Sequence, residues 1–150
     1  MSTILGRFNG SLNRKAYYNN EVSIEEIVNA PIVNWPLGLF DCSPISNGAA
    51  AAIICRADKA ARYRTNPVYI KAMQILEAQG ENFLAINQQG VHLKTTRDAA
   101  IRAYKEADIS DPREQINILE THDSCTITEL LSCEDLQISR YGKQFVFNQI

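Results

Sequence analysis

The sequence lacks the features that mark membrane-bound, exported or nucleic-acid-binding proteins. No apolar run reaches the ~18 residues that a membrane-spanning helix needs, and Arg7, Asn9 and Arg14 interrupt the N-terminus where an apolar signal core would lie. The net charge of −2 gives no electrostatic reason to expect nucleic acid or an anionic membrane as a partner. We therefore expect a cytoplasmic protein without a membrane span.

Cysteine is scarce, and its spacing does not favour a metal site. The four cysteines stand at Cys42, Cys55, Cys125 and Cys133, and none belongs to a Cys-x-x-Cys motif. Zinc and redox-pair sites are therefore not favoured, and free cytoplasmic thiols are expected. The scattered basic residues between positions 56 and 64 are typical of a solvated helix face rather than of a phosphate-binding patch.

The composition that is present is that of one globular domain. The 150 residues are 45% apolar and 21% charged, which is ordinary for such a domain and enough to bury a core. Residues 1–20 are polar and rich in Asn and Gly, and we expect them to be irregular. Ser23 with Glu26 forms a capping box, which predicts a short helix to about Asn29.

The middle of the chain alternates between expected strands and loops. The alanine-rich run 49–55 follows a Ser-Asn-Gly turn and precedes a polar helix start, so we expect a central strand there in spite of the helix propensity of alanine. A short helix is expected over 57–63 and a second strand over 68–76. Residues 77–92 show no clear period and are expected to form a surface loop.

The C-terminal part predicts helix, strand and helix. Small residues recur on one face of residues 95–107, after a hydroxyl cap at Thr95, and Asp111-Pro112 ends this pattern. A buried strand is expected over 116–119 and a further helix over 126–136. The expected buried face of that last helix consists of Ile127, Leu130 and Leu131.

Three side chains are candidates for chemistry. His122 follows the expected strand and precedes a helix start, the place where α/β sheets bind ligands, although a buried histidine bonded to backbone is the alternative. Cys125 stands at a helix N-terminus, where a thiol can be activated, but a small buried residue is the simpler interpretation. His92 has no partner in the sequence, and we expect a surface or structural role.

Several motifs, in order, resemble the thiolase superfamily, and in particular acetyl-CoA acetyltransferases of the archaeal and sterol-carrier-protein types. The matching stretches are Asn9–Asn13, Pro36–Cys42, Asn47–Ala51, Tyr104–Ala107 with Asp111-Pro112, and Glu120–Glu129. The last contains His122-Asp123-Ser124-Cys125, which resembles the family's His-Asp-Cys-Phe motif. The sequence departs from the family pattern at Asn47, Ser124 and Cys125, where Asp, Cys and Phe are usual.

The resemblance implies an α/β fold, a fragment of the thiolase fold with a mixed sheet and helices on both faces. It would hold the end of the first half and the start of the second, with 1–20 a remnant of the loop region and 21–150 a partial α/β domain. It also implies that His122 helps to hold the water of an oxyanion hole. The substrate would be a coenzyme A thioester, with no further cofactor and no metal.

The resemblance covers an incomplete enzyme. The family's nucleophilic cysteine, its Gly-His-Pro histidine and its Cys-x-Gly cysteine have no counterpart in this sequence. We therefore expect a thiolase-family acyltransferase chain that is inactive alone. The alternatives are a non-catalytic interaction subunit that pairs with another acyl-CoA-handling chain, and a fragment of a thiolase-like aldolase. Expected partners are acyl-CoA and a second copy or another thiolase-like chain.

Overall fold

The computed structural model describes residues 2–77, 84–87 and 90–142. Helices, strands and one 3-10 turn follow one another in this part of the chain. They are α1 (Ser2–Ser11), α2 (Ile24–Val28), β1 (Ile32–Asn34), β2 (Leu37–Gly38), the 3-10 turn η1 (Leu39–Asp41), α3 (Ala57–Ala60), β3 (Leu84–Asn87), β4 (Gly90–Leu93), α4 (Lys94–Glu106), α5 (Pro112–Gln115) and α6 (Thr126–Asp135).

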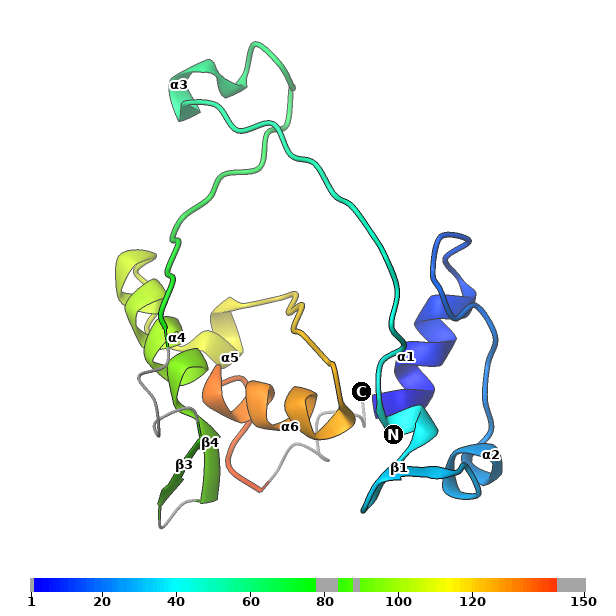
Figure 1. The fold of residues 1–150 in the computed structure, drawn as a ribbon. Coiled ribbons are helices and arrows are strands. Elements are labelled where there is room, and N and C mark those ends of the chain that lie inside the picture. The colour runs from blue at the N-terminus through cyan, green and yellow to red at the C-terminus, as the bar shows by residue number, and fades with distance from the viewer. Residues whose placement is uncertain (1, 78–83, 88–89, 143–150) are drawn as a thin grey trace.

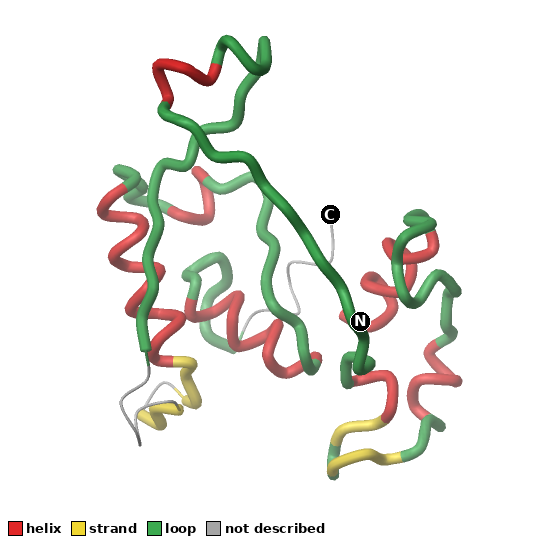
Figure 2. Tube along the Cα trace, turned by 45° about the horizontal axis from the view of Figure 1, so that its top comes forward, coloured by secondary structure: helices red, strands yellow, loops and turns green. Residues whose placement is uncertain are grey.

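The elements form two groups joined by a long excursion of the chain. One group holds α1, α2, β1 and β2, and the other holds β3, β4 and the helices α4, α5 and α6 (Figure 1). Between them, residues 44–77 run out to α3 and return, and this path is also plain in the second view (Figure 2). The two groups touch where α1 contacts α6.

The fold class predicted from the sequence, a mixed α/β fragment, is confirmed. The strands described form two antiparallel pairs, β1 with β2 and β3 with β4. In the second pair Leu84 lies opposite Leu93 and Asn87 opposite Gly90. This hairpin packs against α4 and α6, which makes it the sheet component of the C-terminal group.

The helices whose signals are local lie where the sequence predicts them. The Glu26 N–H donates to Ser23 Oγ at 3.2 Å, and the Ser23 N–H donates to the Glu26 carboxylate at 2.8 Å, so the capping box of α2 is complete. Helices α4 and α6 match the predicted 95–107 and 126–136 within one residue at each end. The helix predicted over 57–63 is shorter than expected, since α3 ends at Ala60.

The strands predicted over 49–55, 68–76 and 116–119 are wrong. All three stretches lack strand pairing, and they lie largely in solvent, with Ile53 98% exposed and Val68 86% exposed. The reason is physical: a strand is stabilised by the strand beside it, and no such partner lies beside these segments in the described part of the chain. The segment 68–76, which returns from α3, is bonded to the last residue of α4: Gln74 Nε2 donates to Glu106 Oε2 at 2.6 Å.

Two regions expected to be irregular form elements instead. Residues 1–20 contain helix α1, and its Gly10 is explained by packing, because a Cβ there would meet the Tyr18 carbonyl oxygen at 2.5 Å. The expected surface loop 77–92 contains the β3–β4 hairpin; its residues 78–83 and 88–89 lie outside the described part. The hairpin forms although its sequence lacks a strand-like alternation, because β3 and β4 are neighbours in the chain and pair with each other.

The core of the C-terminal group is polar, which the sequence did not predict. The buried residues of α6 are Ser132, Glu134 and Asp135 rather than the predicted apolar face, and Ile127 is 46% exposed. Asp135 is completely buried because its carboxylate accepts hydrogen bonds from β4 (below). The predicted cap at Thr95 is also wrong: α4 begins at Lys94, and no side chain caps it.

Of the described helices, α4 is the longest at 13 residues, and none has the length and apolar character that crossing a membrane requires.

Candidate functional site

The structure places His122 on an exposed link. The chain leaves α5 at Gln115 and runs without regular structure to Cys125, the N-cap residue of α6. His122 is exposed on this link, and no hydrogen bond or ion pair joins it to another described residue. The strand predicted before it is absent, so the link, rather than a sheet edge, determines its position.

The structure brings together two of the stretches that carry the family resemblance. The Ser43 N–H donates to the Ser124 carbonyl at 2.8 Å, and Cys42 forms an isolated antiparallel bridge with Cys125. Thr126 Oγ1, in the first turn of α6, donates to Asp41 Oδ1 at 3.3 Å. The segment after η1 is thus fixed beside the start of α6, although 83 residues separate the two cysteines.

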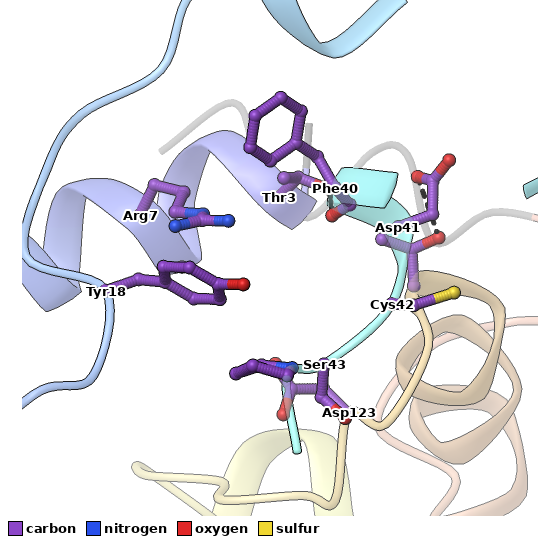
Figure 3. A pocket seen from close by; sticks show the side chains of 11 residues that line it. Thr3, Arg7, Tyr18, Phe40, Asp41, Cys42, Ser43 and Asp123 are labelled. Carbon is purple, nitrogen blue, oxygen red and sulfur yellow. Dashed lines mark hydrogen bonds between the residues drawn. The ribbon is translucent and has the colours of Figure 1, made fainter. Parts of the chain in front are cut away.

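A cavity of about 210 Å³ opens at this junction. It is bounded by α1, by the segment from Phe40 to Pro44, and by the link and first residue of α6 (Figure 3). Asp123, the neighbour of His122 in the chain, lines it. The side chains of Arg7 and Tyr18 approach it from the opposite side to Asp123.

Arg7 is the residue of this cavity that sequence reasoning missed. Its guanidinium carbon lies 3.4 Å from the centroid of the Tyr18 ring and 5.1 Å from that of Phe40, and the residue is only 9% exposed. A cation held between two aromatic faces is favourably placed when it leaves water. With the guanidinium of Arg7 and the carboxylate of Asp123, the lining of the cavity includes both a hydrogen-bond donor and an acceptor.

Cys42, one of the two cysteines of the site, is not poised as a nucleophile. Burial, the hydrogen bond with the Cys125 thiol, and the nearby Cys125 and Asp41 raise the pKa of Cys42 above its ordinary value. The two Sγ atoms lie 3.8 Å apart. A thiol with a raised pKa supplies less of the reactive thiolate at neutral pH.

The matched stretch Asn47–Ala51 does not join the site. Its residues are exposed on the excursion toward α3, and none of them lines the cavity. A separate, open cavity of about 400 Å³ lies on the excursion, and its lining includes Ile53 and Ile54 of the outgoing segment and Val68 and Ile70 of the returning one.

The other histidine, for which the sequence predicted a surface or structural role, is buried and has a structural position. His92 is 3% exposed, and its Nδ1 lies 3.0 Å from Asp135 Oδ1. Its ring packs edge-on against Tyr141 at 4.8 Å between centroids. In the described part of the chain no group of three or more His, Cys, Asp or Glu side chains could hold a metal ion.

No protein-family model matches the chain, but curated proteins do. An acetyl-CoA acetyltransferase of Methanothermobacter thermautotrophicus is 36% identical over 145 residues, which are 95% of this chain and 36% of that protein. A benzoylsuccinyl-CoA thiolase subunit of Thauera aromatica is 30% identical over 147 residues, or 98% of this chain and 37% of that one. Sterol carrier protein 2 of Gallus gallus is 25% identical over 134 residues, which are 87% of this chain and 24% of that protein. The chain therefore spans between 24% and 37% of the length of these relatives.

Proposed function

This chain belongs to the thiolase superfamily, and we propose that it supplies part of an acyltransferase that acts on acyl-CoA thioesters. The observation that carries the proposal is the 36% identity to an acetyl-CoA acetyltransferase over 95% of the chain. The structure supports it, because two of the stretches that match the family meet through the Ser43–Ser124 hydrogen bond. All four cysteines are free thiols, which suits the cytoplasm, where we place the activity.

In this proposal His122 holds a water molecule beside the carbonyl oxygen of the thioester. Hydrogen-bond donors aimed at an oxygen that gains negative charge lower the barrier to acyl transfer. His122 is exposed and does not itself line the cavity at the start of α6, but its neighbour Asp123 does, so the role is supported by the family resemblance and by this place in the chain. The remaining walls of the site would come from the parts of the relatives that this chain does not match.

The chain alone is expected to be inactive. Acyl transfer of this kind needs an activated nucleophile and an acid/base partner, and the family's two cysteines and Gly-His-Pro histidine have no counterpart here. Cys42 is a poor substitute, because its pKa is raised. Activity therefore requires the complementary parts of a thiolase chain.

A chimera tests the proposal. The matched 145-residue segment of the Methanothermobacter acetyltransferase is replaced by the aligned part of this chain, and release of free coenzyme A from acetyl-CoA is measured. We expect an active chimera, and we expect His122→Ala to reduce kcat by about 10²–10³-fold, as loss of one oxyanion-hole donor does. His122→Asn is the matched control and should retain most of the activity, because an amide also holds a water.

The outcomes separate the two parts of the proposal. An active chimera that tolerates His122→Ala would leave the acyltransferase in place and remove His122 from the oxyanion hole. A chimera that folds and assembles like the acetyltransferase but releases no coenzyme A would overturn the acyltransferase proposal.

The second candidate is a non-catalytic subunit that pairs with another thiolase-like chain. It is favoured by the apolar residues exposed along both sides of the excursion, among them Ile53 and Val68. Extended segments with free backbone groups are ready to pair with strands of a partner. Binding to an intact thiolase without any change in its acyl-transfer rate would support this candidate, whereas a chain that associates only with itself would count against it.

A further inference from the structure

Two cysteines far apart in the sequence face each other at one point of the fold. Cys42 and Cys125 are opposite residues of an isolated antiparallel bridge, and their Sγ atoms lie 3.8 Å apart. The adjacent hydrogen bond runs from the Ser43 N–H to the Ser124 carbonyl. Cys42 and Cys125 are therefore a non-hydrogen-bonded pair of the antiparallel bridge. In such a pair the two opposite Cα atoms lie about 4.5 Å apart. That separation is within the range that a disulfide spans, ~4.4–6.8 Å.

We propose that Cys42 and Cys125 are a redox modification site that closes to a reversible disulfide. One thiolate of the pair attacks a sulfur of glutathione disulfide, and one glutathione leaves as its thiolate. The other thiolate then attacks the protein sulfur of this mixed disulfide, and the second glutathione leaves. One disulfide bond forms in the protein, both cysteines lose a proton, and one glutathione disulfide is reduced to two glutathione molecules.

The surroundings hold the pair in register from both sides. The Thr126 hydroxyl donates to Asp41 Oδ1, and the Gly38 N–H donates to Asp41 Oδ2 at 2.9 Å. These contacts fix the residues that flank each cysteine, so closing the bond needs movement of the thiols and little movement of the backbone. Cys42 lines the 210 Å³ cavity, and its sulfur points away from the centre of that cavity (Figure 3). Both cysteines are partly exposed, which gives an oxidant access to the pair.

The other two cysteines serve as internal comparisons. Cys55 is exposed on the excursion beside α3, and Cys133 lies in the second half of α6. Burial, with Glu129 and Glu134 nearby, raises the pKa of Cys133. No sulfur–sulfur contact other than that of Cys42 with Cys125 is present among the described residues.

The disulfide would tie the segment after η1 to the start of α6. Cys125 is three residues from His122, so oxidation would fix the link that carries the histidine. This inference does not depend on the proposed acyl transfer, because it rests only on the two thiols and the backbone around them.

Thiol counting and peptide mapping test the site. The chain with Cys55→Ser, which prevents cross-linking between copies, is incubated with glutathione disulfide, alkylated without reduction and digested. We expect two of the three remaining thiols to be lost, a single peptide pair joined through Cys42 and Cys125, and full recovery with dithiothreitol. With Cys42→Ser added, Cys125 should carry bound glutathione and no internal disulfide should form.

Two results would overturn the proposal. One is glutathione retained on both Cys42 and Cys125 without a joined peptide; the other is a joined peptide that contains Cys133 instead. The double variant Cys42→Ala with Cys125→Ala keeps the test interpretable: if its far-UV circular dichroism matches that of the parent, loss of the joined peptide reports on the thiols and not on folding.

Discussion

At the residue scale, the C-terminal group is held together by one buried carboxylate. Asp135 Oδ1 lies 3.0 Å from His92 Nδ1, and Oδ2 accepts the Leu93 N–H at 2.6 Å. Arg97 approaches the same carboxylate at 3.9 Å. A buried carboxylate is tolerated only when hydrogen bonds and opposite charge compensate for the water it has lost. The Asp135 side chain, at the end of α6, therefore positions β4 and the first turn of α4.

Replacing this carboxylate should be strongly destabilising. We expect Asp135→Ala to lower the free energy of unfolding by about 3 kcal/mol or more, because the buried His92 ring and the Leu93 N–H both lose their partner. Urea denaturation followed by circular dichroism measures the change. Asp98→Ala is the control, since Asp98 pairs with the exposed Lys94 and its loss should change stability by less than about 1 kcal/mol. Equal losses in the two variants would contradict the role given to Asp135.

The sequence predicted a surface or structural role for His92 but not its hydrogen bond with Asp135. Asp135 lies four residues after Leu131 and so shares its side of α6, but a carboxylate is not expected to be buried without a partner. Its burial follows from the hydrogen bonds with β4. Arg7 was missed for a similar reason. Its position between Tyr18 and Phe40 is created by the fold, and no local pattern around residue 7 signals it.

At the element scale, α2 and α5 form where capping signals within a few residues predict a helix start, whereas α1 forms in a stretch without such a signal. The Ser23–Glu26 capping box predicts α2, and the Asp111-Pro112 pair both ends α4's pattern and begins α5, where Asp111 accepts the Arg113 N–H at 3.1 Å. The strands fail because a strand needs a partner that may lie anywhere in the chain. The hairpin β3–β4 forms where its partner is adjacent.

The capping box gives α2 a defined pH dependence. The backbone and side-chain hydrogen bonds from Ser23 hold the pKa of Glu26 below its ordinary value of 4.5. A lowered pKa means that the stabilisation is complete above the ordinary value and is lost as the pH falls through the lowered one. We expect the Ser23 amide chemical shift and the helical Cα shifts of residues 24–28 to change together in acid.

Two variants check this assignment. Glu26→Gln should remove the pH dependence while keeping α2, since an amide oxygen still accepts the Ser23 N–H. Glu25→Gln, which alters a neighbouring carboxylate outside the box, should leave the titration unchanged. A titration that follows Glu25 instead would show that the cap does not control the helix.

At the scale of the whole molecule, the chain has more apolar surface than it buries. Both sides of the excursion are extended and exposed, and the backbone groups of residues 44–55 pair with no other described backbone group. The sequence predicted a strand over 49–55 from the turn before it and the helix start after it, and a strand over 68–76 from its partial alternation. Such segments would pair only within a sheet that has further strands. This chain matches 36% of the length of the Methanothermobacter acetyltransferase.

The excursion is therefore expected to matter for assembly and not for the stability of the chain alone. Ile53→Lys and Val68→Lys should each change the free energy of unfolding of the isolated chain by no more than about 0.5 kcal/mol, because both side chains already lie in water. In the chimera with the acetyltransferase, the same variants should abolish assembly, measured by light scattering after gel filtration, because a charge would be buried between paired strands. Leu12→Lys, at an exposed residue just beyond α1, is the control. If Ile53→Lys and Val68→Lys chimeras assemble as well as the parent, the excursion does not form the strands of a larger sheet.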